Sequence, residues 1–217
     1  MKIATWNIER LKHKNELDLI IENCEKVGAD IFVLTETDSR VNLKYYSIVS
    51  TAPPKDMENY KQTEARVTIY TNYEIVRRID TFDDQTAVCV ELVTEAGNLL
   101  VYGTVIGIYG NRHKNFLYDL QRQVDDIERL AKEGSLCVIG DFNCSFTDNY
   151  YFTKDGRKAL EDVFSKNDMT IVTREQQECI DHIAVSNEFI AGGVNRVHEW
   201  NHDKRLSDHK GIAVELR

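Results

Sequence analysis

The segment LCVIGDFNCSF, residues 136–146, decides the fold of this chain. Its first four residues, Leu136 to Ile139, form an apolar run of the kind found in strands that are covered on both faces. A glycine follows, and then come the polar residues Asp141 and Asn143. Such strands leave a sheet at its carboxyl edge, where clefts form in α/β proteins. A carboxylate and a carboxamide at that edge therefore predict a functional site.

Hydrophobic periodicity organises the rest of the chain around this strand. Helical spacing of apolar residues predicts helices over residues 15–28, 116–130 and 156–167. Apolar runs predict strands over residues 2–8, 30–36, 65–71, 86–94, 98–106, 179–186 and 211–217. Residues 37–64, which contain both prolines, are predicted to be a loop-rich stretch on the substrate side. This mixture indicates an α/β or α+β domain in which helices cover the faces of sheets.

Composition limits the class of protein. The chain has 217 residues, 42% of them hydrophobic, and its two prolines mark no linker, so we expect residues 1–217 to form a single domain. A net charge of −9 argues against non-specific coating of nucleic acid. The five cysteines form no C-x-x-C pair, which argues against a zinc knuckle or a disulfide framework. Without a secretion signal or a long apolar run, we expect a monomeric cytoplasmic protein with no membrane contact.

Polar side chains recur where the predicted strands begin or end. Any single aspartate or asparagine there is explained by capping a helix or stabilising a turn. Together, however, their oxygen atoms are the hard ligands that suit Mg²⁺ or Mn²⁺. The set comprises Asn7, Glu9, Glu36, Asp141, Asn143, Asp181, Asp208 and His209.

Five short segments that carry these residues resemble, in the same order, the motif set of the endonuclease/exonuclease/phosphatase superfamily. They are TWNIE (5–9), LTE (34–36), GDFN (140–143), IDHIAVS (180–186) and LSDHKGI (206–212). The resemblance covers little of residues 37–98. It implies a DNase I-like four-layer sandwich, in which two packed mixed sheets are flanked by helices. It also implies a metal-dependent phosphodiesterase or phosphomonoesterase.

The resemblance assigns one group of residues to a divalent metal. Asn7, Glu9 and Glu36 match positions that hold or orient Mg²⁺ or Mn²⁺. Asp208 matches a further acidic position at the same site. Glu36 is the ligand on which this assignment depends most.

A second group matches the catalytic positions. Asp181 and His209 match a pair in which the carboxylate fixes the imidazole against the scissile phosphate. Because a carboxylate partner holds the imidazole proton, we expect His209 to act as an imidazolium. Asp141 and Asn143 match the pair that positions the attacking water and braces the phosphate oxygens.

The middle strand departs from the family. Many members carry a phosphate-binding histidine or tyrosine near its end, where this chain has Thr104, which is therefore a candidate for contact with the substrate. Tyr109, Arg112 and His113 follow closely and are candidates to replace it. Basic residues also cluster at positions 10–14, and a positive rim on an acidic protein favours a polyanionic substrate.

Three functions remain open on the sequence alone. The first is a Mg²⁺-dependent nuclease or related phosphodiesterase. The second is a phosphomonoesterase, or a hydrolase of small-molecule or lipid phosphodiesters, because a fold does not determine a substrate. The third is a catalytically inactive interaction domain, although a scaffold has no packing reason to collect partly buried carboxylates.

Two further features of the sequence bear on these functions. The aromatic residues 150–152 follow the GDFN segment and would suit stacking on bases. His182 follows Asp181 in a predicted strand, so its side chain is expected on the opposite face, in a structural role.

Overall fold

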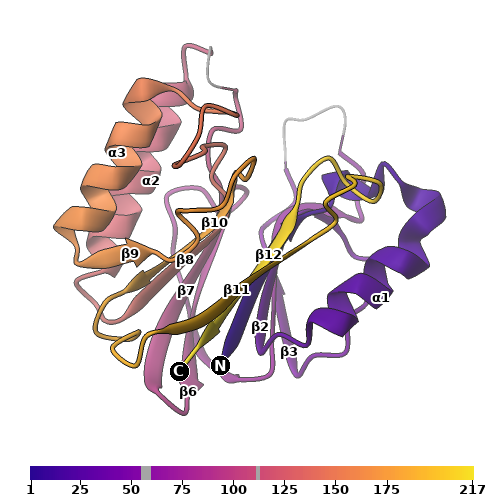
Figure 1. Cartoon of the computed structure of the whole chain (residues 1–217), viewed down its shortest axis with the longest axis horizontal. Helices are drawn as coiled ribbons and strands as arrows, with labels where there is room; N and C mark the ends of the chain where they lie inside the picture. Colours follow the sequence, from indigo (N-terminus) through magenta and orange to yellow (C-terminus); the bar gives the residue numbers. More distant parts are fainter. Residues whose placement is uncertain (55–59, 111–112) are drawn as a thin grey trace.

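The computed structural model describes residues 1–54, 60–110 and 113–217. These residues form two six-stranded sheets, with the orders β11-β12-β1-β2-β4-β3 and β5-β6-β7-β8-β10-β9. The sheets pack face to face and helices lie outside them (Figure 1), which confirms the four-layer DNase I-like sandwich. The strands are β1 (Lys2–Asn7), β2 (Ile31–Asp38), β3 (Ser47–Ser50), β4 (Glu64–Thr71), β5 (Glu74–Ile79), β6 (Ala87–Thr94), β7 (Gly97–Val105), β8 (Leu136–Asp141), β9 (Met169–Ile171), β10 (Asp181–Ser186), β11 (Val194–Trp200) and β12 (Gly211–Leu216).

The helices form the two outer layers. α1 (Leu17–Val27) covers the first sheet, and α2 (Phe116–Leu130) and α3 (Lys154–Lys166) cover the second (Figure 1). Gly28 ends α1 in the left-handed conformation, with a φ of 58°, as expected for a glycine at this position. Two short 3-10 turns, η1 (Glu9–Leu11) and η2 (Lys14–Glu16), lie between β1 and α1. Among the described residues, no helix combines the length and apolarity needed to cross a membrane.

Three apolar layers explain why the central strands are hydrophobic almost throughout. Between the sheets, Val33 of β2 packs in one cluster with Val101 and Ile139. On the other face of β2, Phe32 packs in the cluster that contains α1. Successive side chains of a strand point to opposite faces, so a strand covered on both sides needs apolar residues at nearly every position.

Four strands were not predicted, and they are the four edges of the two sheets. They are β3, β5, β9 and β11. β3 lies within residues 37–64, so the prediction of a loop-rich stretch there was wrong in part. An edge strand is paired on one side only, and exposed residues interrupt its apolar pattern, as in β5, where five of six residues are not buried.

The directions of the strands bring the predicted site residues of both sheets to one edge. β1 runs parallel to β2, and β7 runs parallel to β8, while the other pairs are antiparallel. β10 starts where β8 ends, with Asp181 opposite Asp141. β12 starts beside the end of β1, with Ile212 opposite Thr5. The residues just before β12 therefore lie next to the residues that follow β1.

Candidate active site

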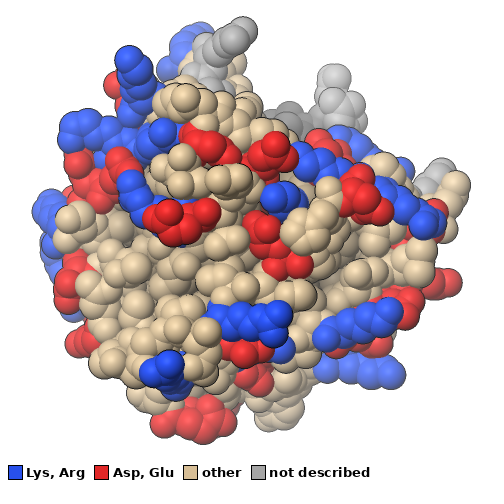
Figure 2. All heavy atoms as spheres, in the orientation of Figure 1, with Lys and Arg blue, Asp and Glu red and all other residues tan. Residues whose placement is uncertain are grey.

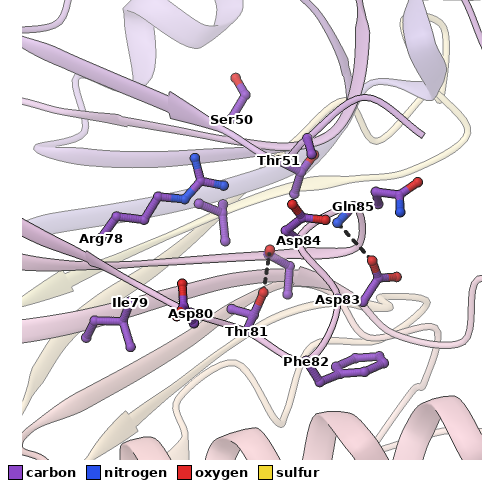
Figure 3. A pocket seen from close by; sticks show the side chains of 13 residues that line it. Ser50, Thr51, Arg78, Ile79, Asp80, Thr81, Phe82, Asp83, Asp84 and Gln85 are labelled. Atoms are coloured by element: carbon purple, nitrogen blue, oxygen red, sulfur yellow. Dashed lines mark hydrogen bonds between the residues drawn. The ribbon is translucent and has the colours of Figure 1, made fainter. Parts of the chain in front are cut away.

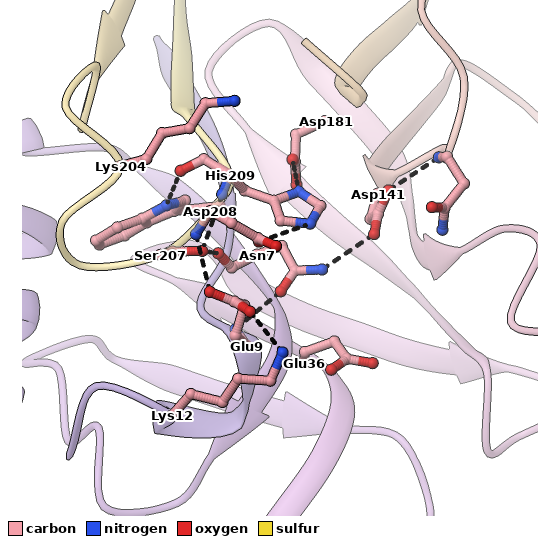
Figure 4. Close-up of polar contacts among 12 residues, drawn as sticks. Asn7, Glu9, Lys12, Glu36, Asp141, Asp181, Lys204, Ser207, Asp208 and His209 are labelled. Atoms are coloured by element: carbon pink, nitrogen blue, oxygen red, sulfur yellow. Dashed lines mark hydrogen bonds and ion pairs between the residues drawn. The ribbon is translucent and has the colours of Figure 1, made fainter. Parts of the chain in front are cut away.

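A cavity of about 370 Å³ opens at this shared edge. Figure 4 shows polar side chains from both sheets pointing toward one another there. His209 also lines an adjoining hollow of about 410 Å³, to which Asp181 contributes. The structure thus brings the predicted metal and catalytic residues to one place. The predicted residues that line the first cavity are Asn7, Glu9, Glu36, Asp141, Asn143, Asp208 and His209.

Two hydrogen bonds join the sheets across the site (Figure 4). Asn7, at the end of β1, donates from Nδ2 to Oδ2 of Asp141 over 3.0 Å. The Nδ1 of His209 lies 2.6 Å from Oδ2 of Asp181, the first residue of β10. Each bond pairs a residue from the first sheet's side with a carboxylate of the second. Neither carboxylate is therefore placed by its own sheet alone.

The turn after β8 holds Asp141 in a polar cradle. Gly140 has a φ of 138°, and a Cβ at this position would lie 2.1 Å from the carbonyl oxygen of Thr104, so a glycine is required here. The backbone N–H of Asn143 donates to Oδ1 of Asp141 over 2.8 Å. Burial raises the pKa of Asp141 to about 7, with nearby His209 lowering it and Asp181 raising it.

Asn143 is itself held in a costly backbone conformation. Its φ is 47°, which costs a non-glycine residue of order 1–3 kcal/mol. Its Nδ2 donates to the carbonyl oxygen of Ile106 over 2.9 Å. An amide nitrogen carries two hydrogens, so one donor remains for a ligand in the cavity.

His209 is oriented by contacts on its backbone and on its ring. Its carbonyl oxygen accepts from the indole N–H of Trp6 over 3.1 Å, and its N–H donates to the hydroxyl of Ser207 over 3.1 Å. Burial by itself lowers the pKa of the imidazole, but the Asp181 carboxylate outweighs it and raises the pKa to about 10. The ring is therefore an imidazolium at neutral pH, with Nε2 lying 3.5 Å from Oδ1 of Asp208.

Glu36 lies beside Arg10, from the basic cluster at positions 10–14, and among two side chains that the sequence did not indicate, Tyr60 and Arg66. Arg10 donates from Nε to Oε2 of Glu36 over 3.2 Å, and the Tyr60 hydroxyl donates to Oε1 over 3.2 Å. The guanidinium groups of Arg10 and Arg66 lie over the Tyr60 ring, 4.6 Å and 5.6 Å from its centroid. Arg66 lies on β4 and is buried, yet it lines the cavity. An arginine within the apolar run ARVTIYT was the only signal of this role.

Glu9 is tied to its surroundings through both oxygens. Oε1 lies 2.6 Å from Nζ of Lys12, and Oε2 accepts from the backbone N–H of Asp208 over 2.8 Å. Burial raises the pKa of Glu9, but the bonds from Lys12 and Asp208 outweigh burial and hold it below the ordinary value. Glu9 thus fixes the Asp208 loop against the end of β1.

The donor set fits a hard divalent cation. The side chains that line the cavity offer carboxylate and amide oxygens from Asn7, Glu36 and Asp208, which are the ligands that Mg²⁺ and Mn²⁺ prefer. Oδ1 of Asp181 is buried without a hydrogen-bond partner among the described residues. Ligand atoms of Asp141, Asp181 and His209 also lie within 4.8 Å of one another. The first group offers oxygen ligands alone, whereas His209 is already paired through Nδ1 with Asp181, so the first group is better suited to Mg²⁺ or Mn²⁺.

The candidates for substrate binding have different outcomes. Thr104 is fully buried and donates from Oγ1 to Oε1 of Gln123 over 2.7 Å, so the prediction that it contacts substrate was wrong. Its strand position faces α2 rather than the cavity. Tyr109 and His113 are exposed and stack on each other, with ring centroids 5.2 Å apart. Arg112 lies outside the described residues.

Charge is mixed over the face seen in Figure 2. Basic and acidic side chains alternate there with uncharged surface, and neither sign forms a continuous field. A separate hollow, of about 640 Å³, lies at the edge strands β3 and β5 and includes Arg78, Asp80 and Asp84 (Figure 3). None of the predicted site residues within the described ranges lines this hollow. The predicted metal and catalytic residues therefore lie at the first cavity and the hollow that adjoins it, away from β3 and β5.

His182 faces away from the site, as its strand position predicts. It is fully buried, with Nδ1 2.9 Å from the Thr173 hydroxyl and Nε2 3.2 Å from the Cys179 carbonyl oxygen. Its ring packs edge-on against Phe146, with centroids 4.8 Å apart. Burial lowers the pKa of His182 to about 4.

This burial predicts a pH-dependent loss of stability. The unfolded chain takes up a proton on His182 near pH 6.5 and the folded chain near pH 4, so its contribution to stability is complete above pH 6.5 and falls between those values. Between pH 7 and pH 5 the loss is about 2 kcal/mol. The decrease in the free energy of unfolding from pH 7 to pH 5, measured by urea unfolding, should be smaller in His182→Gln than in the wild type by this amount. The matched control is His202→Gln, at an exposed position, and an equal change in both variants would contradict the prediction.

Solved structures similar to this one have low sequence identity but share the whole fold. A 3′ phosphatase from Neisseria, bound to a product DNA hairpin, has 17% identity and a TM-score of 0.72, covering 100% of this chain and 99% of that one. An AP endonuclease from Archaeoglobus fulgidus has 15% identity and a TM-score of 0.73, with coverage of 100% and 99%. The AP endonuclease LMAP from Leishmania major has 15% identity and a TM-score of 0.74, with coverage of 100% and 87%.

Family membership comes from the sequence comparison. None of the curated proteins compared with the chain matches it. The model of the endonuclease/exonuclease/phosphatase family, however, matches residues 4–209. This match runs through every motif that supplies a side chain to the cavity, and the chain therefore belongs to the endonuclease/exonuclease/phosphatase family of phosphoester hydrolases.

Proposed function

We propose that the protein, acting through residues 1–217 as one domain, is a divalent-metal-dependent nuclease that hydrolyses phosphodiester bonds. The observation that carries the proposal is the convergence of Asp141, Asn143 and His209 on one cavity beside Glu36. Fold relatives described as AP endonucleases and as a 3′ phosphatase support action on nucleic acid. The basic side chains of Arg10, Lys12 and Arg66, which line the cavity, favour a polyanionic substrate.

The chain's own groups meet the needs of phosphate-ester hydrolysis. Oδ1 and Oδ2 of Asp141 are held by Asn143 and Asn7, which leaves the carboxylate fixed to orient the attacking water and take its proton. The imidazolium of His209, kept in place by Asp181, donates from Nε2 to a phosphate oxygen. The remaining N–H of Asn143 braces a second phosphate oxygen. Preorganised donors of this kind need no rearrangement as charge develops.

Mg²⁺ or Mn²⁺ would be held by Glu36 with Asn7 and Asp208. When bound, the ion neutralises charge on the phosphate and assists the departing oxygen. Arg10 donates to Oε2 of Glu36 in the structure. With Glu36 bound to the ion, the guanidinium of Arg10 would bind the phosphate instead. Glu9 keeps Asp208 in position through its backbone N–H.

The test compares substrates with and without metal. Protein stripped with EDTA is assayed on a chromogenic phosphodiester, a phosphomonoester, plasmid DNA and labelled single-stranded DNA and RNA. We expect diester cleavage that requires added Mg²⁺ or Mn²⁺. Cleavage of the monoester alone would replace the proposal with a phosphatase function. If neither diesters nor the monoester are cleaved, and a titration shows no binding of metal, the result would favour an inactive interaction domain.

A further inference from the structure

Exposed aromatic side chains gather beside the catalytic cavity. Tyr109 is 48% exposed, Tyr150 is 46% exposed and Tyr151 is 38% exposed. They come from two segments, one after β7 and one after the GDFN turn of β8. Both segments emerge at the edge of the sheet that carries the site.

Tyr151 joins three hollows into one surface. It lines the catalytic cavity, the adjoining hollow that contains Asp181 and His209, and a third hollow of about 730 Å³. Tyr150 lines the second and third hollows, and Tyr109 and His113 line the third. A nucleic-acid strand with one phosphate bound at His209 would therefore have its neighbouring nucleotides beside these rings.

Tyr151 is held in place although its ring is exposed. Its carbonyl oxygen accepts from the backbone N–H of Ser145 over 2.7 Å. Its N–H donates to Oγ of Ser145 over 3.0 Å. Ser145 is fully buried and lies two residues after Asn143, so the backbone that carries the Tyr151 ring is anchored to the catalytic turn itself. A preorganised aromatic loses little conformational entropy when a ligand stacks on it.

Cations accompany the rings. Nζ of Lys204 donates to the Tyr150 hydroxyl over 2.8 Å and lies 4.7 Å from the centroid of the ring. Lys210 lines the second hollow, together with the acidic Glu178. Aromatic rings combined with cations form the usual surface for single strands, because bases stack on rings while cations follow the phosphates.

We propose that Tyr151, with Tyr150 and Tyr109, binds unpaired bases next to the scissile phosphate, and that the preferred substrate is single-stranded nucleic acid. The inference rests on the proposed nuclease function and specifies its substrate class. Bases in an intact duplex are stacked on one another, so their faces are not available to these rings without unpairing. Tyr151 is therefore a specificity-determining residue that contacts substrate rather than the reacting atoms.

Binding is measured apart from catalysis. The affinity of a labelled eight-nucleotide single strand is measured by fluorescence anisotropy in EDTA, so that no cleavage occurs. Stacking on one aromatic ring is worth about a tenfold change in affinity. We expect Tyr151→Leu to weaken binding about tenfold and Tyr151→Phe to retain it. The matched control is Tyr46→Leu, whose 77% exposed ring lies outside the three hollows.

Substrates that lack bases give the decisive comparison. The same strand with abasic sugars should bind wild type and Tyr151→Leu equally, and a blunt duplex should show no effect of the substitution. Equal weakening with and without bases, or no weakening at all, would overturn the inference. So would failure of the wild type to bind the single strand. Because hydrolysis of the chromogenic diester tests the nuclease function separately, each proposal can fail without the other.

Discussion

Replacing Asp141 with asparagine is expected to lower phosphodiester turnover about 1,000-fold, the middle of the range for losing a general acid or base. The carboxylate lies between Asn7 and the backbone N–H of Asn143, where it faces the cavity. Asparagine keeps the size of the side chain but cannot accept a proton from water. The measurement is kcat on the chromogenic diester with saturating Mg²⁺.

The control for this variant changes an aspartate elsewhere. Asp84→Asn alters the hollow at β3 and β5 (Figure 3), away from the predicted site, and should leave turnover unchanged. Thermal unfolding of Asp141→Asn should remain cooperative with a lower Tm, because its amide nitrogen must face one of the two donors that the carboxylate accepts from, Asn7 Nδ2 or the Asn143 N–H, and kcat is therefore compared well below that Tm. Retention of a tenth or more of the activity would exclude Asp141 as the group that activates water.

Substitutions at His209 and Asp181 are expected to be non-additive. His209→Ala should lower kcat about 1,000-fold, because it removes the donor to the phosphate. Asp181→Asn should lower it about 100-fold, since it loosens the imidazole and weakens its positive charge. If Asp181 acts only through the 2.6 Å contact with His209, the double variant should be no slower than His209→Ala alone.

This cycle distinguishes a positioning role from an independent one. Independent actions would multiply, giving a decrease of about 100,000-fold in the double variant. The control, His202→Ala, removes an exposed imidazole in the same loop region and should have wild-type kcat. A multiplicative decrease would show that Asp181 acts on the substrate or the metal by a route that does not include His209.

The catalytic cavity is built from buried carboxylates, whereas the aromatic surface beside it is exposed. Asp141 and Asp181 are buried, and their placement depends on contacts between the two sheets. Tyr151 is exposed but anchored through Ser145 to the same turn. Catalysis and substrate choice therefore share one structural support. Substitution of Ser145 would disturb both at once, and for this reason Tyr151 itself is the better probe of substrate choice.

The sequence by itself determined the central strands and the motif residues of the site. β1, β2, β7 and β8 are covered on both faces, so each needs an apolar run that can be read without knowing its partners. Polar residues at the ends of such runs are conspicuous for the same reason. The resemblance of the five motifs to the family then implied that Glu36, Asp141 and His209 share one site.

Only the tertiary structure decided what depends on partners distant in sequence. The edge strands β3, β5, β9 and β11 are defined by pairing with a neighbour, because their own side chains are partly exposed. The burial of Thr104 depends on α2, which supplies Gln123. Tyr60 reaches Glu36, and Arg66 reaches the Tyr60 ring, through the pairing of β2 with β4 and the chain that precedes β4. Such contacts are set by distances in space, and no local pattern of residues encodes them.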